Sequence, residues 1–134
     1  MSDRISQADR SRVMRRIGAK NTVPEMRVRR LIHKMGYRYR LHRRDLPGSP
    51  DIVFVKQRRV IFVHGCFWHQ HDCPRGTRPV SNTRFWNSKL QKNVERDRQN
   101  IAALTSAGWC VLVVWECQTK STVFLANLVK RFLD

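Results

Sequence analysis

The chain has 134 residues and a mass of 15.9 kDa, enough for a single domain with a hydrophobic core. It carries 27 Lys and Arg against 10 Asp and Glu, and this net charge of +17 favours nucleic acid as the partner over its main rival, an anionic membrane surface. No apolar run of roughly eighteen residues is present, which excludes a membrane-spanning helix. The start of the chain lacks an apolar secretory segment, so we expect a protein of the reducing cytoplasm or nucleoid, whose four cysteines bind metal or pack in the core.

Two helices are predicted at the start of the chain. Residues 7–17 form a basic helix with few apolar members, among them Met14. A second helix begins after Thr22, which is its N-cap, and Glu25 three residues later completes a capping box. Gly36 ends this helix. We expect the first helix, within residues 1–20, to contact DNA.

Three strands are predicted next, at residues 37–41, 51–55 and 60–63, and the last two form a hairpin. The rest of the chain is predicted to hold a long helix at 83–107, a deeply buried strand at 109–115 with Cys110 as a small core residue, and a helix at 122–132. The apolar face of this last helix is expected to consist of Phe124, Leu125, Leu128 and Phe132. This order predicts an α/β fold, a mixed β-sheet flanked by helices, in one domain over residues 1–134.

A loop rich in thiols and imidazoles follows the hairpin. Residues 64–82 show no periodicity, and so long a connection in a small domain needs something to hold it. The candidate metal ligands are three thiols and one imidazole: Cys66, Cys73, Cys117 and either His69 or His71. Three cysteines and one histidine are a common closed set for structural zinc. The sequence therefore predicts a Zn2+ that ties the active-site loop 64–82 to the core, the alternative being a group of buried thiols.

Three carboxylates lie where a solvated charge is not expected. Asp51 opens an apolar strand, Glu25 shares a helical face with apolar residues, and Asp97 interrupts the apolar seam of the long helix. A buried carboxylate is costly unless it is paired, hydrogen-bonded or bound to a metal. The alternatives are that Glu25 only closes its capping box, and that Asp97 pairs with an arginine or orients a histidine. An acid at the start of a central strand, facing a loop of histidines, favours a Mg2+ site in which a neutral histidine takes the proton of the attacking water.

Aromatic rings in the polar loop indicate contact with DNA bases. Phe67 and Trp68 are consecutive, so they cannot easily share one interior face. Rings wedged between base steps kink a duplex, and Met14 on the basic helix is placed to wedge from the other groove. For Trp86 and Met14 the alternative is packing within the protein. The arginines of the first helix, Arg15 among them, are expected to contact phosphates.

Longer motifs add a family resemblance. With Pro50-Asp51, residues 64–69 (HGCFWH) and residues 93–98 (NVERDR), the chain resembles the very-short-patch-repair DNA mismatch endonucleases, the Vsr family, over most of its length. The resemblance implies a restriction-endonuclease-like fold with a structural zinc. It also implies Mg2+-dependent nicking on the 5′ side of the mispaired thymine in a T:G mismatch, as arises when 5-methylcytosine deaminates.

The resemblance implies residue roles as well. Asp51 matches the metal-bridging aspartate, and the backbone carbonyl of Val63, where a threonine is familiar, matches a second magnesium contact. His69 matches the catalytic histidine beside the attacking water, which leaves His71 to join the three cysteines on zinc. The other matching positions are Glu25 and His64 for metal-bound waters, Asp97 for support of the histidine, and Phe67, Trp68, Trp86 and Met14 for the intercalating wedge.

Two other functions compete with this interpretation: a non-catalytic, zinc-stabilised nucleic-acid-binding module, and a nuclease of the same fold with a different DNA substrate. Asp51 separates the binding module from the nucleases, because a lone carboxylate near phosphates would repel them. From the resemblance and the size of the chain we expect a monomer that acts on double-stranded DNA, paired in function with a DNA cytosine methyltransferase and other repair proteins.

Overall fold

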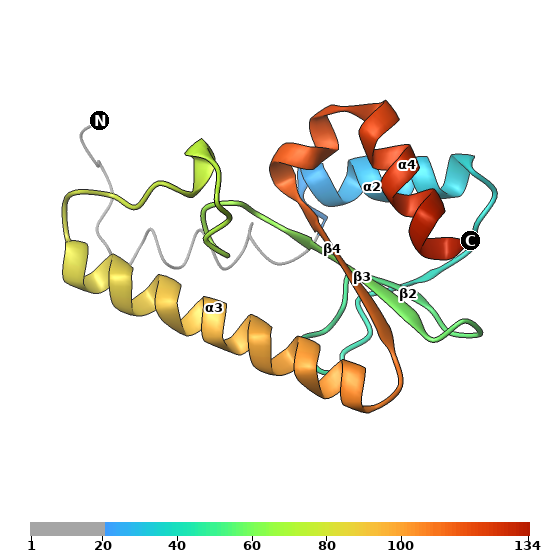
Figure 1. Cartoon of the computed structure of the whole chain (residues 1–134), viewed down its shortest axis with the longest axis horizontal. Helices are drawn as coiled ribbons and strands as arrows, with labels where there is room; N and C mark the ends of the chain where they lie inside the picture. The colour runs from blue at the N-terminus through green and yellow to red at the C-terminus, as the bar shows by residue number, and fades with distance from the viewer. Residues whose placement is uncertain (1–20) are drawn as a thin grey trace.

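The computed structural model describes residues 21–134, so the basic helix predicted at 7–17, with Met14 and Arg15, lies outside the described residues. Figure 1 shows how the helices and strands of this part of the chain are arranged. In order they are α2 (Val23–Lys34), β1 (Arg40–Leu41), β2 (Ile52–Phe54), β3 (Arg59–His64), the 3-10 helix η1 (Pro74–Gly76), α3 (Thr83–Ser106), β4 (Cys110–Trp115), the 3-10 helix η2 (Glu116–Lys120) and α4 (Thr122–Leu133). None of these helices is long and apolar enough to cross a membrane.

The strands form one four-stranded sheet in the order β1-β2-β3-β4. β1 with β2 and β2 with β3 are antiparallel pairs, whereas β3 and β4 are parallel, with Ile61 opposite Leu112. A parallel pair needs a crossover connection, and the segment between β3 and β4 that contains η1 and α3 provides it. The mixed sheet flanked by helices is the predicted architecture.

The helices cover both faces of the sheet. α2 and α4 lie together on one face, and α3 runs across the other (Figure 1). Side chains alternate between the faces of a strand, and the buried residues therefore separate into two clusters. The cluster beneath α2 and α4 contains Val28, Ile32, Ile52, Phe54, Ile61, Val114, Leu125, Val129 and Leu133. The cluster beneath α3 contains Val53, Val60, Phe62, Leu104 and Trp109.

The start of α2 follows the predicted capping in part. The Thr22 hydroxyl accepts a hydrogen bond from the Glu25 amide at 3.3 Å, so Thr22 is the N-cap as predicted. The Glu25 carboxylate accepts from the backbone amide of Asn21 at 3.2 Å rather than from that of Thr22. Glu25 is nonetheless only 1% exposed, because its side chain points inward from the first turn of the helix.

Three predictions of detail are wrong. β4 is not deeply buried and Cys110 is exposed, because β4 is the edge strand among the described residues and pairs only with β3. Phe124 is 50% exposed, whereas Leu125 is buried as predicted, Leu128 and Phe132 are partly buried against the core, and α4 also buries Val129 and Leu133. The strand predicted at 37–41 is reduced to β1, two residues long.

Candidate active site

The candidate site lies where β2 begins and β3 ends. These strands are antiparallel with Ile52 opposite Ile61, so Asp51, just before β2, lies beside the end of β3. The Asp51 carboxylate accepts a hydrogen bond from the backbone amide of Val63 through Oδ2 at 2.7 Å. The residue after Val63 is His64, the last residue of β3, and its side chain is buried. The sheet therefore brings an acid and a histidine from different strands to one end.

A second carboxylate and a histidine join Asp51. Glu25 of α2 lies close enough that its carboxyl group acts on the ionisation of Asp51. His42 places its ring Nε2 2.8 Å from Oε2 of Glu25. One potential ligand atom from each of these three side chains lies within 4.8 Å of the others.

The environment of Asp51 disfavours its charged form. Burial raises the pKa of the Asp51 carboxyl to about 7, the hydrogen bond from the Val63 amide acts against this rise, and the nearby Glu25 carboxyl adds to it. Asp51 and Glu25 are both buried, and a carboxyl oxygen of one lies within 4.8 Å of a carboxyl oxygen of the other. Two buried carboxyl groups this close favour either a shared proton or a bound cation. Their arrangement thus fits the predicted divalent metal.

The histidines form a second group beside β3. The rings of His64 and His69 stack with centroids 3.8 Å apart and planes inclined by 6°. His69 Nδ1 is hydrogen-bonded to Oδ2 of Asp97, which extends from α3. Burial lowers the pKa of His64 to about 4, the neighbouring His69 lowers it further, and Asp97 acts in the opposite direction. His64 is therefore neutral at physiological pH.

Asp97 fixes the orientation of the His69 ring. A carboxylate is an acceptor only, so the neutral ring donates its proton from Nδ1 and keeps a lone pair on Nε2. Of the two alternatives for Asp97, the structure favours orientation of a histidine over pairing with an arginine. Since Val63 contacts Asp51 and the adjacent His64 stacks on His69, the carboxylates and histidines share one end of the sheet.

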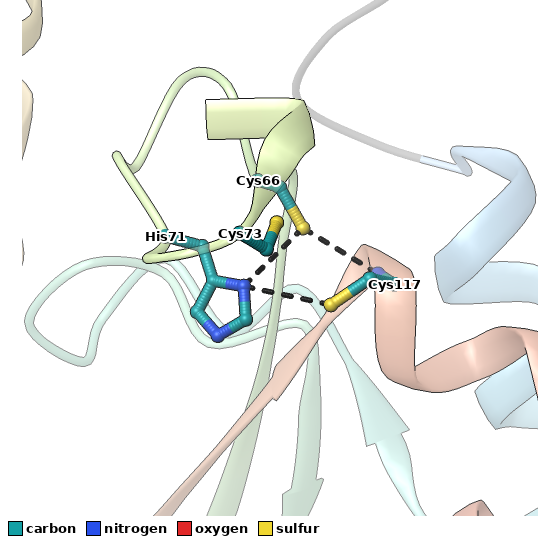
Figure 2. Close-up of side chains that lie close together, drawn as sticks. All are labelled: Cys66, His71, Cys73 and Cys117. Carbon is teal, nitrogen blue, oxygen red and sulfur yellow. Dashed lines mark hydrogen bonds between the residues drawn. The ribbon is translucent and has the colours of Figure 1, made fainter. Parts of the chain in front are cut away.

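The cysteines gather around His71 rather than His69, which answers the question left by the spacing (Figure 2). His71 Nδ1 lies 3.7 Å from Cys66 Sγ and 3.5 Å from Cys117 Sγ, and Cys73 completes the group. A tetrahedral zinc with bonds of about 2.0–2.3 Å needs ligand atoms about 3.4–3.8 Å apart. The two measured separations match that requirement, so the residues fit zinc.

The thiol chemistry also fits a cation. Burial raises the pKa of the Cys66 thiol to about 12, a backbone hydrogen bond from Cys117 acts against this, and hydrogen bonds with the other thiols raise it further. A bound zinc would offset the cost of burying the charged Cys66 thiolate, because zinc binds the thiolate form of cysteine. All four cysteines lie in the described part of the chain, and none forms a disulfide.

This cluster fastens the loop 64–82 to the end of β4. The Cys66 amide donates to Oε1 of Glu116 at 3.3 Å, and the Cys117 amide donates to Cys66 Sγ at 3.4 Å. The His71 ring stacks on Trp115 with centroids 4.4 Å apart. Gly76 lies so close to the His71 carbonyl that a Cβ there would overlap it. The loop that carries His69 is thus held from both sides.

The aromatic residues form one group beside the histidines. Phe67 and Trp68 are half-buried, and their ring centroids lie 5.5 and 5.8 Å from that of Trp86. Trp86 itself is buried, so in this structure it supports the other two rings. Two α3 residues to which the sequence analysis assigned no role hold this group: Lys89 lies over the Trp68 ring, and Asn93, the first residue of the motif 93–98, donates to the Trp68 carbonyl at 3.3 Å.

Sequence reasoning also missed His42. The signal was present in the strand pairing, because Leu41 opposite Ile52 places His42 opposite Asp51, and the His42 amide donates to the Asp51 carbonyl at 3.1 Å. To predict that His42 lies beside Asp51, one would need to know the pairing register of β1, a strand only two residues long. Every site residue predicted within 21–134 lies in the Glu25–His42–Asp51 group, in the His64–His69–Asp97 group, in the cysteine and His71 group or in the aromatic group, except Val63, whose amide contacts Asp51.

Comparison with known proteins identifies the family of the chain. The sequence model of the family described as DNA mismatch endonuclease Vsr matches residues 2–75. The type II nicking enzyme V.XorIIP of Xanthomonas oryzae pv. oryzae is 48% identical over 134 residues, which is 100% of this chain and 98% of the relative. The DNA mismatch endonuclease Vsr of Escherichia coli is 46% identical over 117 residues, 87% of this chain and 75% of the relative. The type II nicking enzyme V.NmeAIP of Neisseria meningitidis is 42% identical over 133 residues, 99% of this chain and 95% of the relative. As its motifs predict, the chain belongs to the Vsr family of DNA endonucleases.

Proposed function

We propose that this endonuclease nicks DNA on the 5′ side of the mispaired thymine in T:G mismatches and so starts very-short-patch repair. The observation that carries the proposal is the meeting of the Glu25–Asp51 carboxyl pair with the His69–Asp97 pair at one end of the sheet. Such a centre suits metal-dependent phosphodiester hydrolysis. The relatives, named as a mismatch endonuclease and as nicking enzymes, support the substrate and the single-strand cut.

Asp51 and the backbone carbonyl of Val63 are the proposed protein ligands of Mg2+. The Val63 amide reaches Asp51, and the amide and carbonyl of one residue point to the same side of a strand. The Val63 carbonyl is therefore directed to the same gap as the carboxylate, and hard oxygen donors are those that Mg2+ prefers. The bound ion would neutralise charge on the phosphate that is attacked.

The protein side chains divide the remaining work. His69 Nε2, left with its lone pair by the bond from Nδ1 to Asp97, takes the proton of the attacking water. Asp97 stabilises the imidazolium that results. The neutral ring of His64 supports His69 by stacking. Glu25 and His64 hold waters beside the phosphate.

The Cys66, His71, Cys73 and Cys117 group is proposed to bind a structural Zn2+. It closes with four protein ligands and leaves no position for a substrate. Its role is to fix the loop 64–82, and with it His69 between two of the ligands. Without that restraint the histidine would lose its alignment with Asp97.

The aromatic group and the positive charge are proposed to bind the mismatched duplex. Phe67 and Trp68 wedge between base steps, supported from behind by Trp86, while Met14 and Arg15 of the N-terminal segment contact DNA from the other side. A T:G pair stacks less well than a matched pair and is cheaper to open. The proposed functional partners are a DNA cytosine methyltransferase and other repair proteins, and the proposed state is a monomer.

The test is a nicking assay on duplexes with each strand labelled separately. Wild-type protein is expected to cut only the thymine strand, 5′ of the T, and only when Mg2+ is present. Asp51→Asn should bind the T:G duplex with similar affinity but not cut it. Binding without cleavage by the wild type would favour the non-catalytic module, and equal cleavage of matched DNA would favour a nuclease with another substrate.

A further inference from the structure

His42 belongs to the carboxylate group but has no part in the mechanism above. Its ring Nε2 lies 2.8 Å from Oε2 of Glu25, and its side chain is 15% exposed against 2% for that of Glu25. It is also within reach of Asp51, since one ligand atom from each of the three residues lies within 4.8 Å of the others. The group therefore offers two carboxylates and an imidazole rather than oxygen atoms alone.

The backbone holds His42 in this position. It directly follows β1, and its amide donates to the Asp51 carbonyl at 3.1 Å, so the chain around His42 is tied to Asp51 itself. His42 adopts a left-handed backbone with φ of 48°. Residues with a Cβ adopt that conformation rarely. This turn, next to a two-residue strand, directs the ring toward Glu25.

The spacing of the donor atoms fits a shared cation. Two adjacent ligands of an octahedral ion with bonds of about 2.1 Å lie about 3.0 Å apart. The separation of 2.8 Å between His42 Nε2 and Glu25 Oε2 is close to that edge. It is also the length of an ordinary hydrogen bond, so the geometry alone admits a role in which His42 only orients Glu25.

The other contacts of Glu25 leave room for a cation. Oε1 accepts from the Asn21 amide at 3.2 Å, and Oε2 is 3.4 Å from Nη1 of Arg29, a long and weak contact. The guanidinium of Arg29 has a second partner in the Asn21 side chain at 2.8 Å. It can release Oε2 and keep a hydrogen bond. A cation between Glu25, His42 and Asp51 would offset the mutual repulsion of the two carboxylates.

We propose that His42 is a direct nitrogen ligand of the divalent cation in this active site, beside Asp51 and Glu25, so that Glu25 binds the cation itself in addition to the waters assigned to it above. This rests on the proposed function, which places a cation at Asp51. Coordination through Nε2 requires the neutral ring with its proton on Nδ1. A mixed nitrogen and oxygen set favours transition ions such as Mn2+ over Mg2+ more strongly than an all-oxygen set does.

The test measures Mn2+ bound to zinc-loaded protein, without DNA. Electron spin-echo envelope modulation detects a nitrogen atom bound to Mn2+. The wild type should show this coupling, and His42→Gln should lose it and bind Mn2+ about tenfold or more weakly. His33→Gln is the matched control, because His33 is an exposed histidine of the neighbouring α2, and its signal should equal that of the wild type.

A second variant and a second readout keep the test decisive. His42→Asp replaces the nitrogen by oxygen, so it should bind Mn2+ without nitrogen coupling and with a lower ratio of Mn2+ to Mg2+ affinity. Mn2+ binding whose nitrogen coupling is missing in the wild type, or persists in both His42 variants, would overturn the role of His42 and leave the proposed function intact. A wild-type protein that binds no Mn2+ or Mg2+ would contradict the metal site and the proposed function together.

Discussion

Replacing Asp51 with asparagine should stabilise the metal-free protein while it abolishes cleavage. The pKa of the Asp51 carboxyl is near 3.8 in the unfolded chain and about 7 in the folded protein. Burial and the nearby Glu25 carboxyl disfavour the charged form more than the hydrogen bond from the Val63 amide favours it. Between these values unfolding releases a proton, so the folded protein loses stability as pH rises. The contribution of the neutral Asp51 carboxyl to the free energy of unfolding is thus fully present below about pH 3.8 and lost once the pH has risen through about 7.

The magnitude follows from the two pKa values. At 1.36 kcal/mol per pKa unit, ionising Asp51 in the folded state costs about 4 kcal/mol above pH 7 and about 2 kcal/mol at pH 5. Asparagine has no such charge and keeps an oxygen for the Val63 amide. The advantage of Asp51→Asn over the wild type in the free energy of unfolding should therefore grow by about 2 kcal/mol between about pH 5 and about pH 8.

Urea denaturation of zinc-loaded protein in magnesium-free buffer at both pH values measures this difference. Glu95→Gln is the control, because Glu95 is an exposed residue of α3 in a surface ion pair with Arg98 at 3.6 Å, and such pairs contribute little. Adding Mg2+ should raise the stability of the wild type but not of Asp51→Asn. An advantage for Asp51→Asn that is equal at the two pH values would refute the argument that Asp51 is forced to ionise in a buried site.

Three further predictions concern zinc, the histidine and the aromatic rings. Cys117→Ser should lower the zinc content by about one equivalent per chain, measured by atomic emission, whereas Cys110→Ser, at an exposed position outside the cluster, should not change it. Asp97→Asn should lower the single-turnover nicking rate by about 10²–10⁴-fold with little change in DNA affinity, because the neutral amide cannot stabilise the His69 imidazolium and can donate to Nδ1, which favours the wrong ring tautomer. An equal loss of affinity and rate would indicate misfolding instead. Trp68→Ala should weaken binding to a T:G duplex more than to a matched duplex in fluorescence anisotropy, and equal losses on both would indicate a packing role alone.

The proposed zinc ligands were the most predictable part of the site. Cys66, His71 and Cys73 are close in sequence, and a short loop holds its own residues near one another whatever the fold does. Cys117 follows the last strand, and the structure confirms that this strand ends beside that loop. Spacing alone could not choose between His69 and His71. That choice depends on the path of the loop, which turns at Gln70 with φ of 52°.

Other features depend on tertiary pairing that residue patterns do not encode. The apolar sequence of β4 suggested a central strand, yet β4 lies at the edge of the described sheet, and this exposes Cys110. His42 lies between two weakly patterned segments, and only the pairing of β1 with β2 places it against Glu25. Glu25 looked like part of a helix cap, whereas its burial and its contact with His42 come from α2 packing on the sheet.

The central claim is that Asp51 and His69 act on the same phosphodiester bond, and a double-mutant cycle tests it most directly. Single-turnover nicking of a T:G duplex would be measured for the wild type, Asp51→Glu, which keeps a displaced carboxylate and with it a measurable rate, His69→Gln and the double variant. Groups that serve one chemical step are not additive, so the double variant should be no more than about fivefold slower than the slower single variant. Rate losses that multiply in the double variant would show that the two residues act independently and would contradict the account.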